Sequence, residues 1–468
     1  MSAPAGRPAT LRAWLLTLLV ASASVVPFWT CAVVPTQDGA SHLYNAWLLV
    51  HRDDPALQAS RFFRVNPFVP NWGGVGPLAL LLTVAPPTVA EKLFFSLIAL
   101  LLVLGAAALT ARLGGDPVLA SAVAVSIAHG WLVAMGFTGF VLALGLGLCL
   151  GAWAAGRYAA APPSQELPTA LVLTTAFTVL FFLHLAAAAL AAGMAALILL
   201  TTRAGHLQQP KRLLLPGLPF VALALLLAAH YVGSLGRVEP TYRPDTRGAL
   251  GRLLELPAGT YWESYSTADD GLGTAAFVLV LGLVLARATR RGPASSPARA
   301  FLLAAPAVLV AYMLVPFAAG GGAFLTDRLV PLLLLLPLPW ATSLGLPRRQ
   351  ALRAGALLLV AAVLGQRGAQ YRHWGRTVES LVELNRGVAP GALLVQAARI
   401  DPDDVGVDPL CHLWGRVAIE ARAVPLVDYE ATLRGWFPLS YTAEAQALST
   451  AWTSRGELPP GAVEIRYR

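Results

Sequence analysis

Long apolar segments separated by short polar loops recur along most of the 468-residue chain. Their lengths suit helices that cross a bilayer, and we count about eleven. The predicted spans are residues 11–34, 89–112, 117–134, 137–157, 168–185, 186–201, 213–232, 271–288, 300–319, 328–346 and 351–366. The pattern therefore predicts an α-helical polytopic membrane protein, with residues 1–366 as its membrane domain.

The arginines between the spans predict the orientation. With a cytoplasmic N-terminus, the basic loops at Arg112, Arg157, 203–212, 287–299 and 348–353 all lie inside, as the positive-inside rule requires. The first segment is long enough to span, so we expect an uncleaved anchor, with cleavage near its small residues as the alternative.

One apolar block, Val75 to Ala85, is too short to cross and is followed by Pro86-Pro87. We expect an interfacial or re-entrant helix there. Three regions then face outward: the loop 35–88, the loop 233–270 and everything after Gln366.

Composition excludes some classes of function. Hydrophobic residues make up 56% of the chain and charged residues 13%, and the net charge is +9. The arginines sit mostly in short loops, without a basic run among exposed aromatics, so we expect no nucleic-acid partner. The three cysteines, Cys31, Cys149 and Cys411, are widely spaced and without a CxxC, which favours packing roles.

After Gln366 the composition changes to that of a soluble domain. Tyr371 to Arg386 has an amphipathic helical pattern, and Ala392 to Val395 reads as a short strand. We expect residues 367–468 to form a small extracytoplasmic α/β domain. For its polar residues His412, Asp428 and Glu430 we expect a structural role.

The first outer loop holds the most informative stretch, residues 37–46, with Asp38 and His42 just beyond the first span. From Ser41 to His51 the pattern is helical, with Ser41 as a candidate N-cap. If the helix began earlier, Asp38 and His42 would share a face. Gly39 is equally compatible with a turn, and a carboxylate at a span end is commonly a solvated or capping residue.

Other polar and aromatic residues gather toward the same side of the membrane. His129, His184 and His230 lie near the outer ends of their spans, which indicates an outward polar cavity or the ordinary preference of imidazole for interfaces. Tyr261 and Trp262, in the second outer loop, suit stacking on a sugar, the rim of a lipid groove or an interfacial belt.

Four features together resemble the GT-C superfamily of integral-membrane glycosyltransferases. Asp38 follows the first span, and Glu91-Lys92-Leu93 opens the next after the Pro86-Pro87 break. Residues 326–331, Thr-Asp-Arg-Leu-Val-Pro, precede a leucine-rich span, and an outer tail follows the terminal span. The chain departs from the family where Gly39 follows Asp38 in place of an acidic residue, and where the late span opens with Arg-Leu instead of Arg-Tyr.

The resemblance implies an enzyme that transfers a sugar from a polyprenyl-phosphate-linked donor on the extracytoplasmic face of a bacterial inner membrane. The acceptor would be a cell-envelope glycan, lipid or protein. Asp38 would be the general base of an inverting displacement. Arg328 would stabilise the lipid phosphate, although an arginine at a span end also simply snorkels.

The remaining site residues have open roles. His42 would orient Asp38, bind a divalent metal with it or contact phosphate, and Tyr44, His184, Tyr261 and Trp262 are further candidates for substrate binding. No cofactor is certain and a divalent metal stays open; Asp53 and Asp54 are candidates for a second carboxylate. An envelope-glycan polymerase or ligase and a transporter are the alternatives, but a transporter predicts repeats and mid-span ionisable residues, whereas here these residues gather at the outer edge.

Overall fold

The computed structural model describes residues 10–160, 163–203, 214–234, 243–257, 264–290, 294–319, 322–343, 349–397, 406–433 and 435–467. Within these ranges ten helical segments, two of them with a short break, are long and apolar enough to cross a membrane. They are Leu11–Trp29, Pro87–Arg112, Pro117–Met135, Thr138–Tyr158, Glu166–Leu183, Leu185–Thr202, Leu214–Gly233, Ala268–Ala288, Ser296–Leu314 and Arg349–Leu384. The prediction of a polytopic α-helical membrane protein is confirmed.

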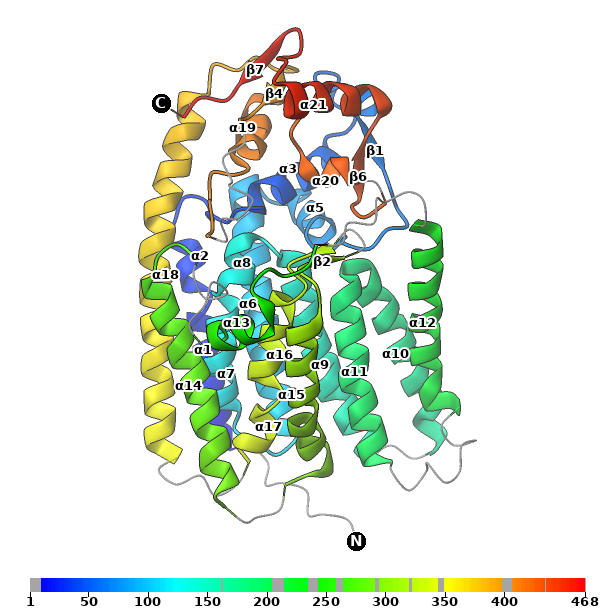
Figure 1. Cartoon of the computed structure of the whole chain (residues 1–468), viewed down its shortest axis with the longest axis vertical. Helices are drawn as coiled ribbons and strands as arrows, with labels where there is room; N and C mark the ends of the chain where they lie inside the picture. The colour runs from blue at the N-terminus through cyan, green and yellow to red at the C-terminus, as the bar shows by residue number, and fades with distance from the viewer. Residues whose placement is uncertain are drawn as a thin grey trace.

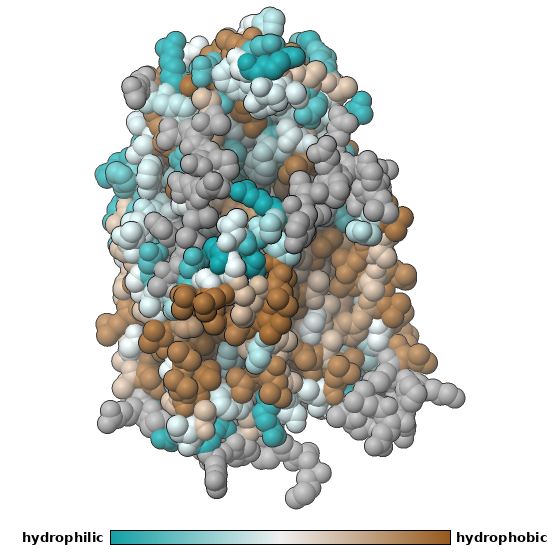
Figure 2. All heavy atoms as spheres, in the orientation of Figure 1, coloured by the Kyte–Doolittle hydropathy of each residue, from teal (hydrophilic) through white to brown (hydrophobic). Residues whose placement is uncertain are grey.

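These segments correspond to α1 (Leu11–Ala23) with α2 (Val26–Trp29), α6 (Pro87–Arg112), α7 (Pro117–Ala128) with α8 (Trp131–Met135), α9 (Thr138–Ala160), α10 (Glu166–Leu183), α11 (Leu185–Thr202), α12 (Leu214–Ser234), α14 (Ala268–Ala288), α15 (Ser296–Leu314) and α18 (Arg349–Leu384). They stand side by side as one bundle (Figure 1). Apolar residues cover its lower part in the view of Figure 2, and hydrophilic residues gather above them, as expected for a protein with a lipid-facing belt.

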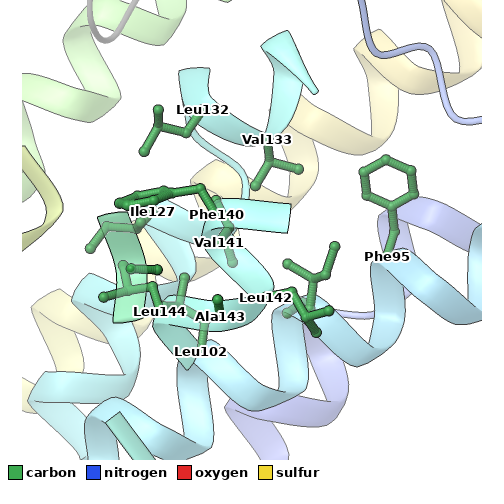
Figure 3. Packing of buried hydrophobic residues seen from close by; sticks show 14 of the residues in the cluster. Phe95, Leu102, Ile127, Leu132, Val133, Phe140, Val141, Leu142, Ala143 and Leu144 are labelled. Carbon is green, nitrogen blue, oxygen red and sulfur yellow. The ribbon is translucent and has the colours of Figure 1, made fainter. Parts of the chain in front are cut away.

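The centre of the bundle is formed by α6 to α9. Every residue of α7 is buried, and the cluster drawn in Figure 3 joins Ile127 of α7 with Phe95 and Leu102 of α6 and Leu132 and Val133 of α8. Residues 140–144 of α9 close the same cluster. This rigid centre holds the α8–α9 junction, which becomes one wall of the candidate site.

The predicted tenth span, 328–346, is correct in place but wrong as a continuous helix. It consists of a 3₁₀ turn, η4 (Asp327–Leu329), followed by α16 (Val330–Leu335) and α17 (Leu338–Ala341). Pro331, Pro337 and Pro339 each lack a backbone N–H, and a proline inside a helix clashes with the preceding turn. At its far end Thr342 Oγ1 accepts a hydrogen bond of 2.8 Å from Asp116 N, so the broken segment still traverses the bundle.

The expected stop at residue 366 is also wrong. α18 continues unbroken to Leu384 over 36 residues, which at 1.5 Å per residue is about 54 Å, well beyond the roughly 30 Å of a bilayer core. No proline interrupts it, so the predicted span and the predicted helix after Tyr371 form a single rod. This rod reaches the C-terminal residues at the upper end in Figure 1.

The first outer loop and the C-terminal residues interlock at this upper end, which we call the site end. The loop contains α3 (Gly39–Val50), α4 (Ala59–Phe62), β1 (Phe63–Val65) and α5 (Gly76–Leu82). The C-terminal part contains β4 (Leu393–Val395), α19 (Leu413–Ala421), β5 (Val424–Pro425), α20 (Tyr429–Thr432), β6 (Leu439–Tyr441), α21 (Ala443–Arg455) and β7 (Ala462–Glu464). β1 pairs antiparallel with β6, Arg64 opposite Ser440, and β4 is flanked by parallel β5 and β7.

The second outer loop, residues 233–270, also has described residues that contact the site end. It includes α13 (Gly248–Glu255), and near it the short strands β2 (Ala318–Ala319) and β3 (Gly322–Ala323) pair. Tyr265 donates a hydrogen bond of 2.8 Å to the carbonyl of Pro35, and Val407 N donates to the carbonyl of Ser264. The described parts of all three predicted outward regions therefore meet at one end of the bundle.

Candidate functional site

A cavity of about 530 Å³ lies between the α8–α9 junction, the start of α11, η4, the first outer loop and the C-terminal part. Aromatic and aliphatic side chains form most of its wall. Its polar and charged lining residues are Gln37, Asp38, His42, Asn71, His184, Arg328, Cys411, His412 and Tyr429. An apolar cleft with a few convergent polar groups is the usual form of a ligand site.

Asp38 is held by its backbone against the end of α8. The amides of Gln37 and Asp38 donate to the carbonyls of Ala134 and Met135 at 2.9 and 3.0 Å. Gly136 lies in the left-handed region, with φ +100°, and a β-carbon there would come within 2.6 Å of Asp38 Cβ. A glycine is therefore required for this contact.

The helix after Asp38 begins at Gly39, two residues earlier than predicted, so Asp38 and not Ser41 takes the N-cap position. An aspartate at an N-cap usually accepts a backbone hydrogen bond, but Asp38 makes none. The residue is only 8% exposed and lines the cavity. Ser41 is instead buried, and its hydroxyl lies 3.1 Å from Glu430 Oε1.

Two side chains from the C-terminal part contact the Asp38 carboxylate. His412 Nε2 lies 3.2 Å from Oδ1, and the Tyr429 hydroxyl donates to Oδ2 at 3.1 Å. The two rings stack on each other with centroids 5.0 Å apart. The structural role expected for His412 is therefore incomplete, because it belongs to the immediate surroundings of Asp38.

His42 lies one helical turn after Asp38 but pairs elsewhere. Its Nε2 lies 2.9 Å from the carbonyl of Gly136, and its Nδ1 lies 2.6 Å from Glu430 Oε1. Burial lowers the pKa of His42, but the Glu430 carboxylate, with Asp38 nearby, outweighs it and raises this pKa to about 9. His42 thus adds a positive charge to the cavity wall that Glu430 balances.

Arg328 enters the cavity from the opposite wall. Its Nη1 donates to His184 Nε2 at 3.1 Å, and its guanidinium lies 4.8 Å from the ring centre of Phe137. Its neighbour Asp327 bonds with Thr326 and faces Arg247 instead. Among the described residues no carboxylate lies within 4.0 Å of Arg328, so an anion entering the cavity would meet a half-buried cation that is not already paired with a carboxylate.

A buried ion pair supports the loop behind Asp38. Arg416 Nη2 donates to Glu91 Oε1 at 2.5 Å and to the carbonyl of Val34 at 3.1 Å. Glu91 Oε2 in turn accepts from Val34 N at 3.3 Å. Because a buried charge is costly unless it is paired and hydrogen-bonded, this network ties α6 and α19 to the irregular segment that leads to Asp38.

The structure brings four of the predicted site residues together, Asp38, His42, His184 and Arg328. Tyr44 does not line this cavity: its ring is fully buried beside Trp414, and its hydroxyl donates to the carbonyl of Ala423. Tyr261 and Trp262 lie outside the described residues.

Other candidates from the sequence lie away from the cavity lining. Asp54 pairs with Arg422 at the surface, and Asp53 is exposed. His129 is a packing residue stacked on Phe28, its Nε2 2.8 Å from the carbonyl of Ser24. His230 packs edge-on against Trp436, a cavity residue that no sequence motif singled out.

In the described part of the chain, no group of three or more His, Cys, Asp or Glu side chains is arranged to hold a metal ion. Asp38 and His42 face different partners, so the structure gives no support to a shared metal site between them.

Comparison with protein-family models finds no match, and comparison with curated protein sequences finds none either. Solved structures similar to this one include a cryo-EM structure of the arabinofuranosyltransferase AftD from mycobacteria. The similarity covers 87% of this chain at 19% identity with a TM-score of 0.46, and this chain spans about a third (33%) of the length of that one.

Proposed function

We propose that this protein is a GT-C-type membrane glycosyltransferase. It would transfer a sugar from a polyprenyl-phosphate-linked donor to a cell-envelope acceptor, with inversion at the sugar carbon. The observation that carries the proposal is that Asp38 and Arg328, a carboxylate without a capping role and a cation without a carboxylate partner, line one cavity at the end of the membrane bundle.

In the proposed reaction the acceptor oxygen attacks the anomeric carbon as the bond from that carbon to the phosphate oxygen breaks. The acceptor hydroxyl is a weak nucleophile and must lose its proton as the new bond forms. Asp38 accepts this proton and later releases it to water. The phosphate leaves on its lipid with the bonding electrons and one additional negative charge.

Arg328 would stabilise the charge that develops on the phosphate. A preorganised cation in a site shielded from water is most effective there, because it needs no reorganisation during the reaction. His184 accepts a hydrogen bond from the guanidinium, and the rings of Phe137 and Phe140 flank it. Apolar lining residues such as Leu185, Phe324 and Leu433 would accompany the first units of the lipid chain.

The proposed sidedness places the site end outside the cytoplasm, with a cytoplasmic N-terminus and a multi-pass location in a bacterial inner membrane. Residues 1–366 would form the membrane domain and residues 367–468 the extracytoplasmic one. The loops at the end opposite the site carry arginines such as Arg112 and Arg349, and Arg349 pairs there with Asp116 at 2.5 Å. The positive-inside rule supports this orientation.

The transporter alternative has one observation in its favour, the proline-broken segment α16–α17, since transporters bind substrates at interrupted helices. Arg328 nevertheless lies at the entry of this segment, and it faces a cavity bounded by the outer loops. A polymerase or ligase acting on lipid-linked glycans would use the same cation and base and differ in the acceptor.

Transfer of labelled sugar tests the proposal. Membranes with the wild-type chain, Asp38→Asn or Asp53→Asn at matched expression are given polyprenyl phosphates labelled in a panel of sugars, together with envelope acceptors. We expect transfer in the wild type and in the exposed control Asp53→Asn, and loss of at least about 100-fold in Asp38→Asn, as for removal of a general base. Equal transfer by the Asp38 variant contradicts the assigned role, and failure of every donor contradicts the function.

A further inference from the structure

The N-cap and first turn of α19 contact Asp38 and the start of α3. His412 and Trp414 contact each other beside the carboxylate, and Gly415 lies against the start of α3. A β-carbon at Gly415 would come within 2.2 Å of the carbonyl of Ala40. With Arg416 bonded to Glu91, α19 is held in close register with α3.

The two nitrogens of His412 have different partners. Trp414 Nε1 donates to Nδ1 at 3.2 Å, while Nε2 lies 3.2 Å from Asp38 Oδ1. An indole nitrogen is a donor only, so Nδ1 must carry a lone pair; a carboxylate is an acceptor, so Nε2 must carry the hydrogen. Only the neutral Nε2–H tautomer satisfies both contacts.

We propose that Trp414 holds His412 as the neutral Nε2–H tautomer, and that His412, together with Tyr429, thereby orients the Asp38 carboxylate as the base without neutralising it. The inference rests on the proposed function and adds positioning residues from the C-terminal part to that site. A protonated His412 would instead form an ion pair with Asp38 and weaken it as a base.

Several groups around His412 favour its protonation. Burial lowers the pKa of His412, but the Cys411 sulfur beside the ring and the Asp38 carboxylate act in the opposite direction, and together they place this pKa well above its ordinary value. Tyr429 and Asp428 face the same ring from the α20 side. The hydrogen bond from Trp414 opposes protonation directly, because only the neutral ring can accept it, and we take this geometric constraint as the deciding one.

The tautomer can be observed without any assay of transfer. The full-length protein is labelled with ¹⁵N-histidine in lipid nanodiscs, and His412→Gln identifies the signal of His412. We expect the neutral Nε2–H form at neutral pH in the wild type and conversion toward imidazolium in Trp414→Phe, which removes the indole donor. An imidazolium or an Nδ1–H tautomer in the wild type overturns the proposal, as does an unchanged signal in Trp414→Phe.

The pH dependence of sugar transfer distinguishes a positioning role of Trp414 from a role in packing alone. Trp47→Phe is the matched control, since Trp47 packs near the same Tyr44 ring as Trp414. We expect Trp414→Phe to move the acidic limb of kcat/KM upward by about one pH unit, with activity recovering at higher pH. Trp47→Phe should leave the limb in place, and in His412→Gln the change at Trp414 should no longer move it.

A uniform loss at every pH in Trp414→Phe overturns the positioning role. Failure of the proposed function has a different signature: Asp38→Asn then transfers sugar as well as the wild type, or the wild type transfers none, while the ¹⁵N spectra still report the tautomer.

Discussion

His42 Nδ1 and Glu430 Oε1 lie 2.6 Å apart, and both side chains are almost completely buried. One belongs to the first outer loop and the other to α20, so this pair joins the two halves of the candidate site. Removing one partner of a buried pair leaves an uncompensated charge, at a cost of about 3–5 kcal/mol.

This pair predicts a stability that declines with rising pH. The folded pKa of His42, about 9, lies above its ordinary value of 6.5, so its contribution is fully present below about pH 6.5 and is lost as the pH rises through about 9. Burial and the Glu430 charge raise the pKa of Asp428 to about 7. A raised carboxyl pKa likewise lowers stability with rising pH, between about 3.8 and 7.

We expect His42→Gln to melt well below the wild type at about pH 6 and close to it at about pH 10, as measured by thermal unfolding in detergent. His373→Gln, at an exposed position of α18, is the control and should follow the wild type throughout. A constant difference between His42→Gln and wild type at all pH values contradicts the ionic origin of the effect.

Gly136 is predicted to be irreplaceable at the site. Alanine there must adopt φ near +100° and places its β-carbon 2.6 Å from Asp38 Cβ and 2.9 Å from Asp38 N. The carboxylate must therefore move, and a displacement of about 1 Å can cost about 100-fold in rate. We expect Gly136→Ala to lose sugar transfer by at least about tenfold.

A substitution at Gly114 distinguishes the effect of backbone strain on transfer from the effect of displacing Asp38. Its φ is +92°, and a β-carbon there would meet nothing within 4 Å. Gly114→Ala should therefore share the strain, of about 1–2 kcal/mol, and keep transfer at the wild-type rate per folded molecule. Equal losses of transfer in the two variants would show that strain alone is responsible.

Arg328 is predicted to act on the phosphate. Arg328→Gln removes the cation, and loss of one such preorganised group typically costs about 100- to 1,000-fold in rate. Arg328→Lys keeps the charge but loses the planar guanidinium between His184 and Phe137, so we expect partial recovery. Steady-state kinetics with the labelled donor measure this order, with exposed Arg64→Gln on β1 as the control; wild-type kcat/KM in Arg328→Gln contradicts the role.

The sequence predicted the spans well because each is a long apolar run, and composition alone determines whether such a run can enter lipid. The predictions from sequence were wrong at two places, where prolines or continued helix formation opposed the boundaries that the apolar pattern indicates. Three prolines break the segment that enters at Arg328, and α18 runs past residue 366 because helix formation continues in the polar residues beyond the membrane.

Half of the candidate site could not be read from local patterns. Asp38, His42 and Arg328 lie beside spans, where their charge is conspicuous. His412 and Tyr429 become neighbours of Asp38 only through the pairing of β1 with β6 and the packing of α19 on α3. Contacts over such sequence separations leave no periodic signature in a single chain. The sequence therefore predicts only a structural role for His412.

The orientation of the bundle yields the last prediction. If the site end is extracytoplasmic, a cysteine at Glu457, exposed near β7, reacts with a membrane-impermeant maleimide in intact spheroplasts. A cysteine at Arg299, exposed at the start of α15 on the opposite end, should react only after permeabilisation. Both substitutions are made after Cys31, Cys149 and Cys411 are replaced by alanine. The reverse labelling pattern would place the cavity in the cytoplasm, where polyprenyl-phosphate sugars presented on the outer face could not reach Asp38.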